Sequence, residues 1–167
     1  MKNYSKIFSC LSVVLTTTFS FGQKYTSPPA KAEGKCGNAS VTIDYCQPSA
    51  HGRKMLGDKE PYGKVWRTGA NKSTSITINA PVKIEGKDLA AGTYALFTIP
   101  GENEWTIIIN KSIEWGAFTY KEADDVLRVK VKPTKTDSFV ETFNISVAND
   151  QVVLKWENTQ VAFNIKG

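Results

Sequence analysis

The chain has 167 residues, of which 41% are hydrophobic, 11% aromatic and 22% charged, and its formal net charge is +5. This composition excludes a disordered or collagen-like chain, and the length indicates one domain that can bury a core without a metal or a disulfide. A single His, three Cys and two Met leave few side chains for metal or nucleophile chemistry.

Residues 1–22 are predicted to be a signal peptide. Lys2 and Lys6 make a basic start, residues 7–21 are uncharged and largely apolar, and Ser20-Phe21-Gly22 fits a small-x-small cleavage site. The apolar run is shorter than the about 20 residues that a membrane span needs. We therefore expect cleavage after Gly22, export to the periplasm or outside the cell, and no stable membrane insertion. Export and the scattered positions of the basic residues also argue against a nucleic-acid partner.

Residues 23–35 are predicted to be an extended lead-in, followed by a single domain over residues 36–167. Cys36 and Cys46 are the cysteines that remain after the leader, and an oxidising compartment allows a disulfide between them. The intervening residues favour one strand, which would separate the two sulfurs by roughly 23 Å at about 3.3 Å per residue. A bridge therefore requires the chain before Cys36 to fold back alongside Cys46, and the sequence leaves this question open.

A metal site is the alternative use of these side chains. Cys46-x4-His51 is an acceptable spacing for zinc or copper, with Cys36 as a third donor. The set contains no paired C-x-x-C motif, and a turn in which His51 makes an ordinary hydrogen bond explains the pattern more simply. No cofactor is therefore predicted.

Beyond the lead-in, apolar and polar residues alternate with a period of two, which is typical of strands with one buried face. The alternating runs cover residues 41–45, 76–78, 105–109, 127–131, 143–147, 152–156 and 161–165. Residues 94–99 and 107–109 are apolar on both faces, which favours central strands. This pattern predicts an all-β fold, an antiparallel two-sheet sandwich of jelly-roll-like type. One or two short helices are expected, at residues 117–125 and 52–57.

Local signals refine this picture. Glu85-Gly86 and Asn149-Asp150 predict tight hairpin turns. Glu141 falls in the inward row of Phe139 and Phe143, and burying a lone carboxylate is costly. We therefore expect an edge bulge near Phe139.

The most site-like segment covers residues 53–71, which are rich in Gly and Pro. In a binding loop, Tyr62 or Trp66 would stack on a sugar or apolar ring, while Arg67 and Asn71 would supply hydrogen bonds. The structural alternative, which we favour, has Trp66 anchoring the loop in the core and Arg67 donating to backbone carbonyls. The candidate ligand-binding residues are Arg53, Tyr62, Trp66, Arg67 and Asn71.

Catalytic motifs are scarce. The chain has no G-x-S-x-G elbow and no H-E-x-x-H motif, and His51 is the only histidine that could serve a triad. No catalytic residue is assigned, and enzyme activity is not the favoured interpretation. Two alternatives stay open: a hydrolase with a loop-built site around His51 and Arg67, and a small metal-binding module on Cys46 and His51.

Two blocks carry a family resemblance, residues 61–71 (PYGKVWRTGAN) and residues 91–100 (AGTYALFTIP). With residues 41–49 and 104–108, they make the chain similar to domain-of-unknown-function family 2911 of secreted bacterial proteins, over almost all of the mature sequence. The resemblance implies export and one β-rich domain, and it assigns no activity. We therefore expect an exported, non-catalytic β-sandwich that binds a small molecule, a glycan or a protein.

Overall fold

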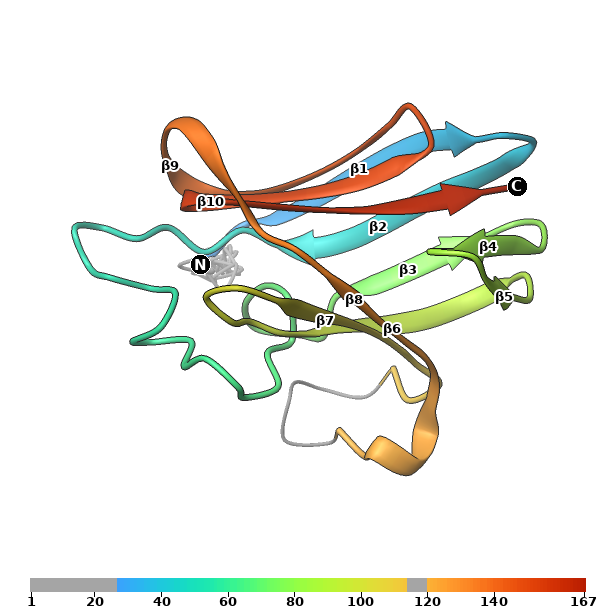
Figure 1. Cartoon of the computed structure of the whole chain (residues 1–167), viewed down its shortest axis with the longest axis horizontal. Helices are drawn as coiled ribbons and strands as arrows, with labels where there is room; N and C mark the ends of the chain where they lie inside the picture. Colours follow the sequence, from blue (N-terminus) through green and yellow to red (C-terminus); the bar gives the residue numbers. More distant parts are fainter. Residues whose placement is uncertain (1–26, 114–119) are drawn as a thin grey trace, which may run out of the picture.

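The computed structural model describes residues 27–113 and 120–167. Within them, ten strands form two antiparallel sheets, which lie as two layers in Figure 1. One sheet has the order β1-β2-β3-β6-β7-β8 and the other the order β5-β4-β10-β9. The strands are β1 (Pro29–Cys36), β2 (Ala39–Cys46), β3 (Ser75–Ile78), β4 (Val82–Ile84), β5 (Lys87–Leu89), β6 (Gly92–Ile99), β7 (Trp105–Asn110), β8 (Asp125–Val131), β9 (Thr134–Ala148) and β10 (Gln151–Lys166).

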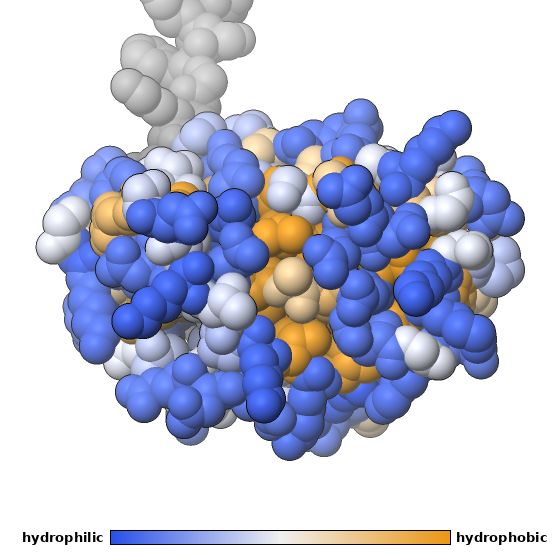
Figure 2. All heavy atoms as spheres, turned by 45° about the horizontal axis from the view of Figure 1, so that its top comes forward, coloured by the Kyte–Doolittle hydropathy of each residue, from blue (hydrophilic) through white to orange (hydrophobic). Residues whose placement is uncertain are grey.

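This arrangement confirms the predicted all-β antiparallel sandwich. Most strands follow the alternation that the sequence shows, as in β2 and β3, with apolar side chains facing the space between the sheets. On the face drawn in Figure 2, mainly hydrophilic side chains surround a narrow apolar strip. None of the helices in the described part of the chain is long and apolar enough to span a membrane. The expected signal peptide, residues 1–22, lies outside the described residues.

β6 and β7 are interior strands of the six-stranded sheet; β6 is central, as predicted, whereas β7 lies next to the edge strand β8. Their inward side chains join the main core, and Ala95, Phe97 and Ile108 form a second apolar cluster on the opposite face. Tyr120 covers this cluster, with its ring 5.2 Å from that of Phe97. Because both faces of these strands are covered, their sequences are apolar without alternation.

The predicted runs 152–156 and 161–165 belong to one long strand, β10, which pairs with the similarly long β9. Their register shifts on both sides of the pair Glu157–Val140, where β9 contains extra residues. The expected bulge is therefore present, and it leaves Phe139 and Glu141 exposed. In Figure 1 both strands turn back at the left of the view, so the bulge lies at one end of the sandwich.

The expected helices are corrected by the structure. Among the described residues the single helical element is a 3-10 turn, Glu122–Asp124, within the predicted 117–125 segment; residues 117–119 lie outside the described part. Residues 52–57 form turns, with positive φ at Gly52 (72°) and Gly57 (84°). Such backbone angles do not continue a right-handed helix, which is why this segment is a loop.

Cys36 and Cys46 are buried and free. The chain before Cys36 does run alongside β2, but the register places Pro29 opposite Cys46 and Ala39 opposite Cys36. The two cysteines therefore lie at opposite ends of the β1–β2 hairpin, too far apart for the disulfide that the sequence left open.

Candidate functional site

Trp66 anchors the loop 53–71 in the core. It is 2% exposed, its ring stacks on Trp156 at 5.5 Å, and its Nε1–H donates to the Gly69 carbonyl at 3.1 Å. Its backbone exchanges two hydrogen bonds with Thr98 of β6, at 2.7 and 3.0 Å. The structure therefore gives Trp66 the structural role that we favoured over a ligand contact.

Arg67 and Asn71 hold the same loop together. Arg67 Nη1 donates to the Asn71 carbonyl at 2.8 Å, and Asn71 Nδ2 donates to the Ser27 carbonyl at 3.1 Å. Arg53 is used in the same way, because its Nε donates to Ala50 at 2.9 Å. Side-chain N–H groups that we predicted as ligand contacts therefore donate to backbone carbonyls of the protein itself.

Two carboxylates fix the other half of the loop. Glu157 of β10, opposite the bulge of β9, accepts the backbone N–H groups of Met55 and Leu56, each at 2.9 Å. Glu60 lies beside Arg67, and burial raises the pKa of its carboxyl to about 7, although the Arg67 charge opposes that shift. The loop is therefore held against β10 by Glu157, and burying the Glu60 carboxylate in it is unfavourable.

A pocket of about 360 Å³ opens where this loop meets the end of the sandwich, and we call it the end pocket. Four segments line it: the loop, the β6–β7 turn with the start of β7, the β8–β9 connection with the start of β9, and the part of β10 opposite the β9 bulge. Its lining residues are Leu56, Tyr62, Gly101, Glu102, Trp105, Pro133, Thr134, Lys135, Asn158 and Thr159. Of the predicted site residues, Tyr62 alone is in this lining.

Tyr62 is held in place from two sides. A Cβ built on Gly57 would lie 2.7 Å from Tyr62 Cε2, so the ring packs directly against the Gly57 backbone. The next residue, Gly63, donates its N–H to the Pro100 carbonyl at 2.9 Å, which ties the turn to β6. Even so, Tyr62 remains 37% exposed. Burial, followed by the charges of Glu102 and Glu157, raises the pKa of its phenol, so the hydroxyl stays protonated at neutral pH.

Trp105, the first residue of β7, also lines the end pocket. It is 2% exposed, and its ring contacts Trp66 edge-on at 6.3 Å. Its buried Nε1–H has no hydrogen-bond partner among the described residues. An unsatisfied buried N–H costs about 1–3 kcal/mol, so this group gains from any acceptor that reaches it.

His51 and Arg53 lie by a separate hollow, lined also by Ser27, Pro48 and Ser49. The imidazole is 71% exposed, and its Nδ1 is 3.9 Å from Glu141 Oε1, which accepts the His51 backbone N–H at 2.6 Å. The nearby Ser49 hydroxyl is paired with that of Thr142 at 2.7 Å. The predicted candidates therefore divide between this hollow, the core and the end pocket, instead of forming one site.

The structure does not bring Cys46 and His51 together as metal ligands. Cys46 is buried at the end of β2, while the His51 side chain is directed to solvent. Within residues 27–113 and 120–167, no three His, Cys, Asp or Glu side chains gather as a metal-binding group.

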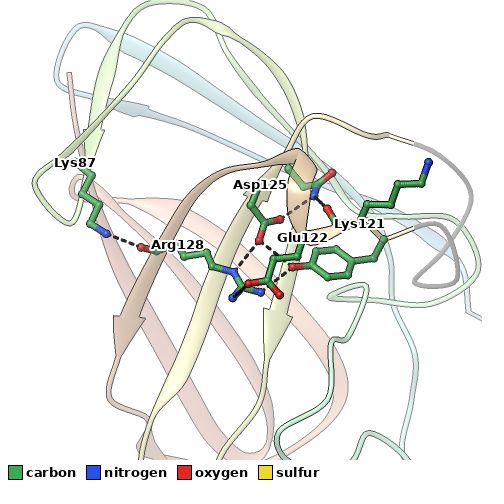
Figure 3. Close-up of polar contacts among 7 residues, drawn as sticks. Lys87, Lys121, Glu122, Asp125 and Arg128 are labelled. Carbon is green, nitrogen blue, oxygen red and sulfur yellow. Dashed lines mark hydrogen bonds and ion pairs between the residues drawn. The ribbon is translucent and has the colours of Figure 1, made fainter.

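A second polar cluster joins β7 and β8 on the outer face of the six-stranded sheet (Figure 3). Asp125, whose side chain is 8% exposed, accepts Asn110 Nδ2 and the Tyr120 hydroxyl, each at 2.8 Å. Arg128 Nε lies 2.7 Å from Asp125 Oδ2, but its N–H is not aligned for a hydrogen bond, so the contact is an ion pair. Arg128 also bonds Glu122 at 3.0 Å and the Tyr120 hydroxyl at 2.7 Å.

Burial, and then the hydrogen bond to Asp125, raises the pKa of Tyr120 to about 12. Apart from the Arg128 Nε–H, the polar groups of this cluster bond to one another, and they hold the chain that follows β7 against the sheet. We therefore assign the cluster a structural role.

Sequence reasoning missed most of the end pocket. Glu102, Lys135 and Asn158 come from segments far apart in the chain, and each by itself is an ordinary surface residue. The turn Pro100-Gly101-Glu102-Asn103 and the break between runs 152–156 and 161–165 were the available signals. Neither indicates that the two segments meet.

Comparison with curated proteins and with solved structures gave no match. The family model described as "Protein of unknown function (DUF2911)" matches residues 27–165, nearly the whole described domain, and the chain therefore belongs to this family.

Proposed function

We propose that this protein is an exported, non-catalytic module that binds a small polar ligand in the end pocket. The observation that carries the proposal is the convergence of four chain segments on one hollow that leaves Tyr62 partly exposed. Aromatic side chains that are rigidly held and open to solvent on one side are typical of ligand sites.

The surrounding contacts support this choice of site. Glu157, Gly57 and Gly63 fix the loop, so the pocket wall is in place before a ligand arrives. A preformed wall lowers the entropic cost of binding. The bulge of β9 opposite Glu157 serves the same end, because β10 departs from its regular pairing there and places Asn158 at the pocket.

Binding is tested by saturation-transfer NMR with a mixed set of monosaccharides, oligosaccharides, amino acids, dipeptides and short carboxylic acids. We expect at least one compound to bind, and we expect Tyr62→Ala to abolish its signal. Phe139→Ala is the matched control, because it removes an aromatic ring that is 52% exposed but does not line the pocket. Equal binding by the Tyr62→Ala variant, or no binding by the parent protein, would refute the proposal.

Export rests on the basic start, the apolar run and the cleavage site of residues 1–22. It is tested by expressing the full-length chain in a bacterium and measuring the mass of the purified product. A mature N-terminus at Gln23 is expected, whereas a protein that keeps its leader in the cytoplasm would contradict export.

A further inference from the structure

We infer that the ligand of the end pocket is an uncharged saccharide, with one sugar ring stacked on Tyr62; this inference rests on the proposed function and adds the ligand class. The lining joins one flat aromatic surface to groups that donate and accept hydrogen bonds. A sugar ring presents the matching chemistry, since one face carries C–H groups and the rim carries hydroxyls.

The charges of the lining favour a neutral ligand. Glu102 and Lys135 are the two ionisable lining groups besides Tyr62, and their charges cancel. A phosphate or sulfate ligand would call for an excess of cations, such as paired arginines. A cationic ligand would call for an excess of carboxylates, which this pocket does not offer.

The uncharged polar groups suit hydroxyls in particular. Thr159 contributes a hydroxyl and Asn158 an amide, so each can donate and accept, while the Thr134 hydroxyl donates to the Gln160 carbonyl at 3.5 Å and can accept. A sugar hydroxyl also does both, and it can therefore pair with a carboxylate, an ammonium group or an amide in the same pocket.

Tyr62 supplies the stacking surface. Its ring rests on Gly57, which leaves no room for a side chain there, and 37% of the residue stays exposed. An exposed aromatic ring that is fixed from behind loses little entropy when a ligand covers it. The pocket volume of about 360 Å³ lies near the lower end of the range for small-molecule sites, roughly 300–1,000 Å³, which suits one or two sugar rings.

Trp105 provides a reporter of occupancy within the pocket itself. Its indole N–H is unpartnered among the described residues, and a hydroxyl-rich ligand brings acceptors to this end of the sandwich. The indole N–H groups of Trp66 and Trp156 already donate to Gly69 and Glu141, and neither tryptophan lines the pocket. These two groups are therefore internal controls in the same spectrum.

The experiment is a ¹⁵N-correlation NMR titration of the mature protein with defined neutral tetrasaccharides of glucose, mannose, xylose and N-acetylglucosamine. The Trp105 indole signal is assigned with a Trp105→Phe variant. A saturable shift of that signal is expected for at least one saccharide, with the Trp66 and Trp156 signals unchanged. Tyr62→Ala should weaken the affinity about tenfold or more, which Kd values from the titration will show, whereas Tyr62→Phe keeps the ring and should retain binding.

The same titration with amino acids, dipeptides and short carboxylic acids separates the two levels of the inference. Should one of these bind in a Tyr62-dependent manner while every saccharide fails, the saccharide class is wrong and the binding function stands. Should no compound of either set move the Trp105 signal, both fall. Saccharide binding that is unchanged in the Tyr62→Ala variant would place the sugar elsewhere and overturn the inference.

Discussion

Replacing Glu60 by Gln should stabilise the protein at pH 8, and only about a quarter as much at pH 5. Burial raises the pKa of this carboxyl from 4.5 to about 7. The folded state therefore binds the proton more tightly than the unfolded state does. Its stability is highest below pH 4.5, falls as the pH rises toward about 7, and stays level above that. Glutamine, which carries no charge, does not incur this loss.

The shift in pKa sets the magnitude. At about 1.36 kcal/mol per unit, the full shift corresponds to roughly 3 kcal/mol. Because Glu60 is only partly buried, water screens part of this effect, and roughly 1–2 kcal/mol of stabilisation is expected at pH 8.

The assay is urea denaturation of the mature protein and the Glu60→Gln variant at pH 5 and pH 8. Asp58→Asn, an exposed acid of the same loop, is the control, and its effect should stay within about 0.5 kcal/mol at either pH. A Glu60→Gln variant that is destabilised at pH 8 would show that the carboxylate is favourably paired, and it would refute the reasoning.

Three further predictions concern the contacts that hold the end pocket and the outer cluster. Trp66→Ala should lower the free energy of unfolding by about 3–5 kcal/mol, because it removes a buried stack on Trp156 and a hydrogen bond to Gly69. Tyr62→Ala, at an exposed ring, is the control. If the two variants lose the same free energy to within about 1 kcal/mol, Trp66 does not anchor the loop. Glu157→Gln should destabilise the fold by about 1–3 kcal/mol, because the carboxylate accepts two loop N–H groups. Hydrogen exchange at the Met55 and Leu56 amides should become faster. Unchanged exchange would show that the loop is held by other contacts. Asp125→Ala should cost about 1–3 kcal/mol in urea denaturation, because it removes an acceptor of two hydrogen bonds, while Arg128 stays partly exposed and keeps Glu122. Spectrophotometric titration should show the tyrosine of pKa about 12 ionising at lower pH, since the bond to Asp125 raises that pKa. An unaltered titration would exclude this coupling.

The local structure of this protein could largely be read from its sequence. The turns Glu85-Gly86 and Asn149-Asp150 have positive φ at all four residues, as tight hairpins of the predicted kind require. The alternation within each predicted run of β10 is present: Val152, Leu154 and Trp156 are each at most 2% exposed, and beyond the bulge the buried row continues in the other phase at residues 161, 163 and 165. Even the unusual position of Glu141 was informative, because an inward carboxylate without a partner costs more than a bulge does.

The end pocket could not be predicted in the same way. Its lining comes from the loop, the β6–β7 turn, the β8–β9 connection and β10. These segments are far apart in the sequence, since the lining residues range from Leu56 to Thr159. The sequence drew attention to Arg67 and Asn71, but their donors satisfy carbonyls that the folded loop brings near them. A sequence shows which hydrogen-bond donors and acceptors a side chain carries, whereas only the fold shows which neighbouring groups they bond to.

The sequence by itself determined most strands, their buried faces and the tight turns, because these depend on the pleat of a strand and on backbone angles within a few residues. It did not show that residues 29–36 pair as β1 or that two predicted runs join as β10. Tertiary structure alone decided which strands are neighbours, as when Ile84 of β4 pairs with Ile165 of β10. It also decided that Cys36 and Cys46 stay apart and that Tyr62 and Asn158 meet in one pocket. The physical reason is that these contacts join residues distant in the chain, and the packing of the whole core, rather than any local preference, selects among the arrangements open to them.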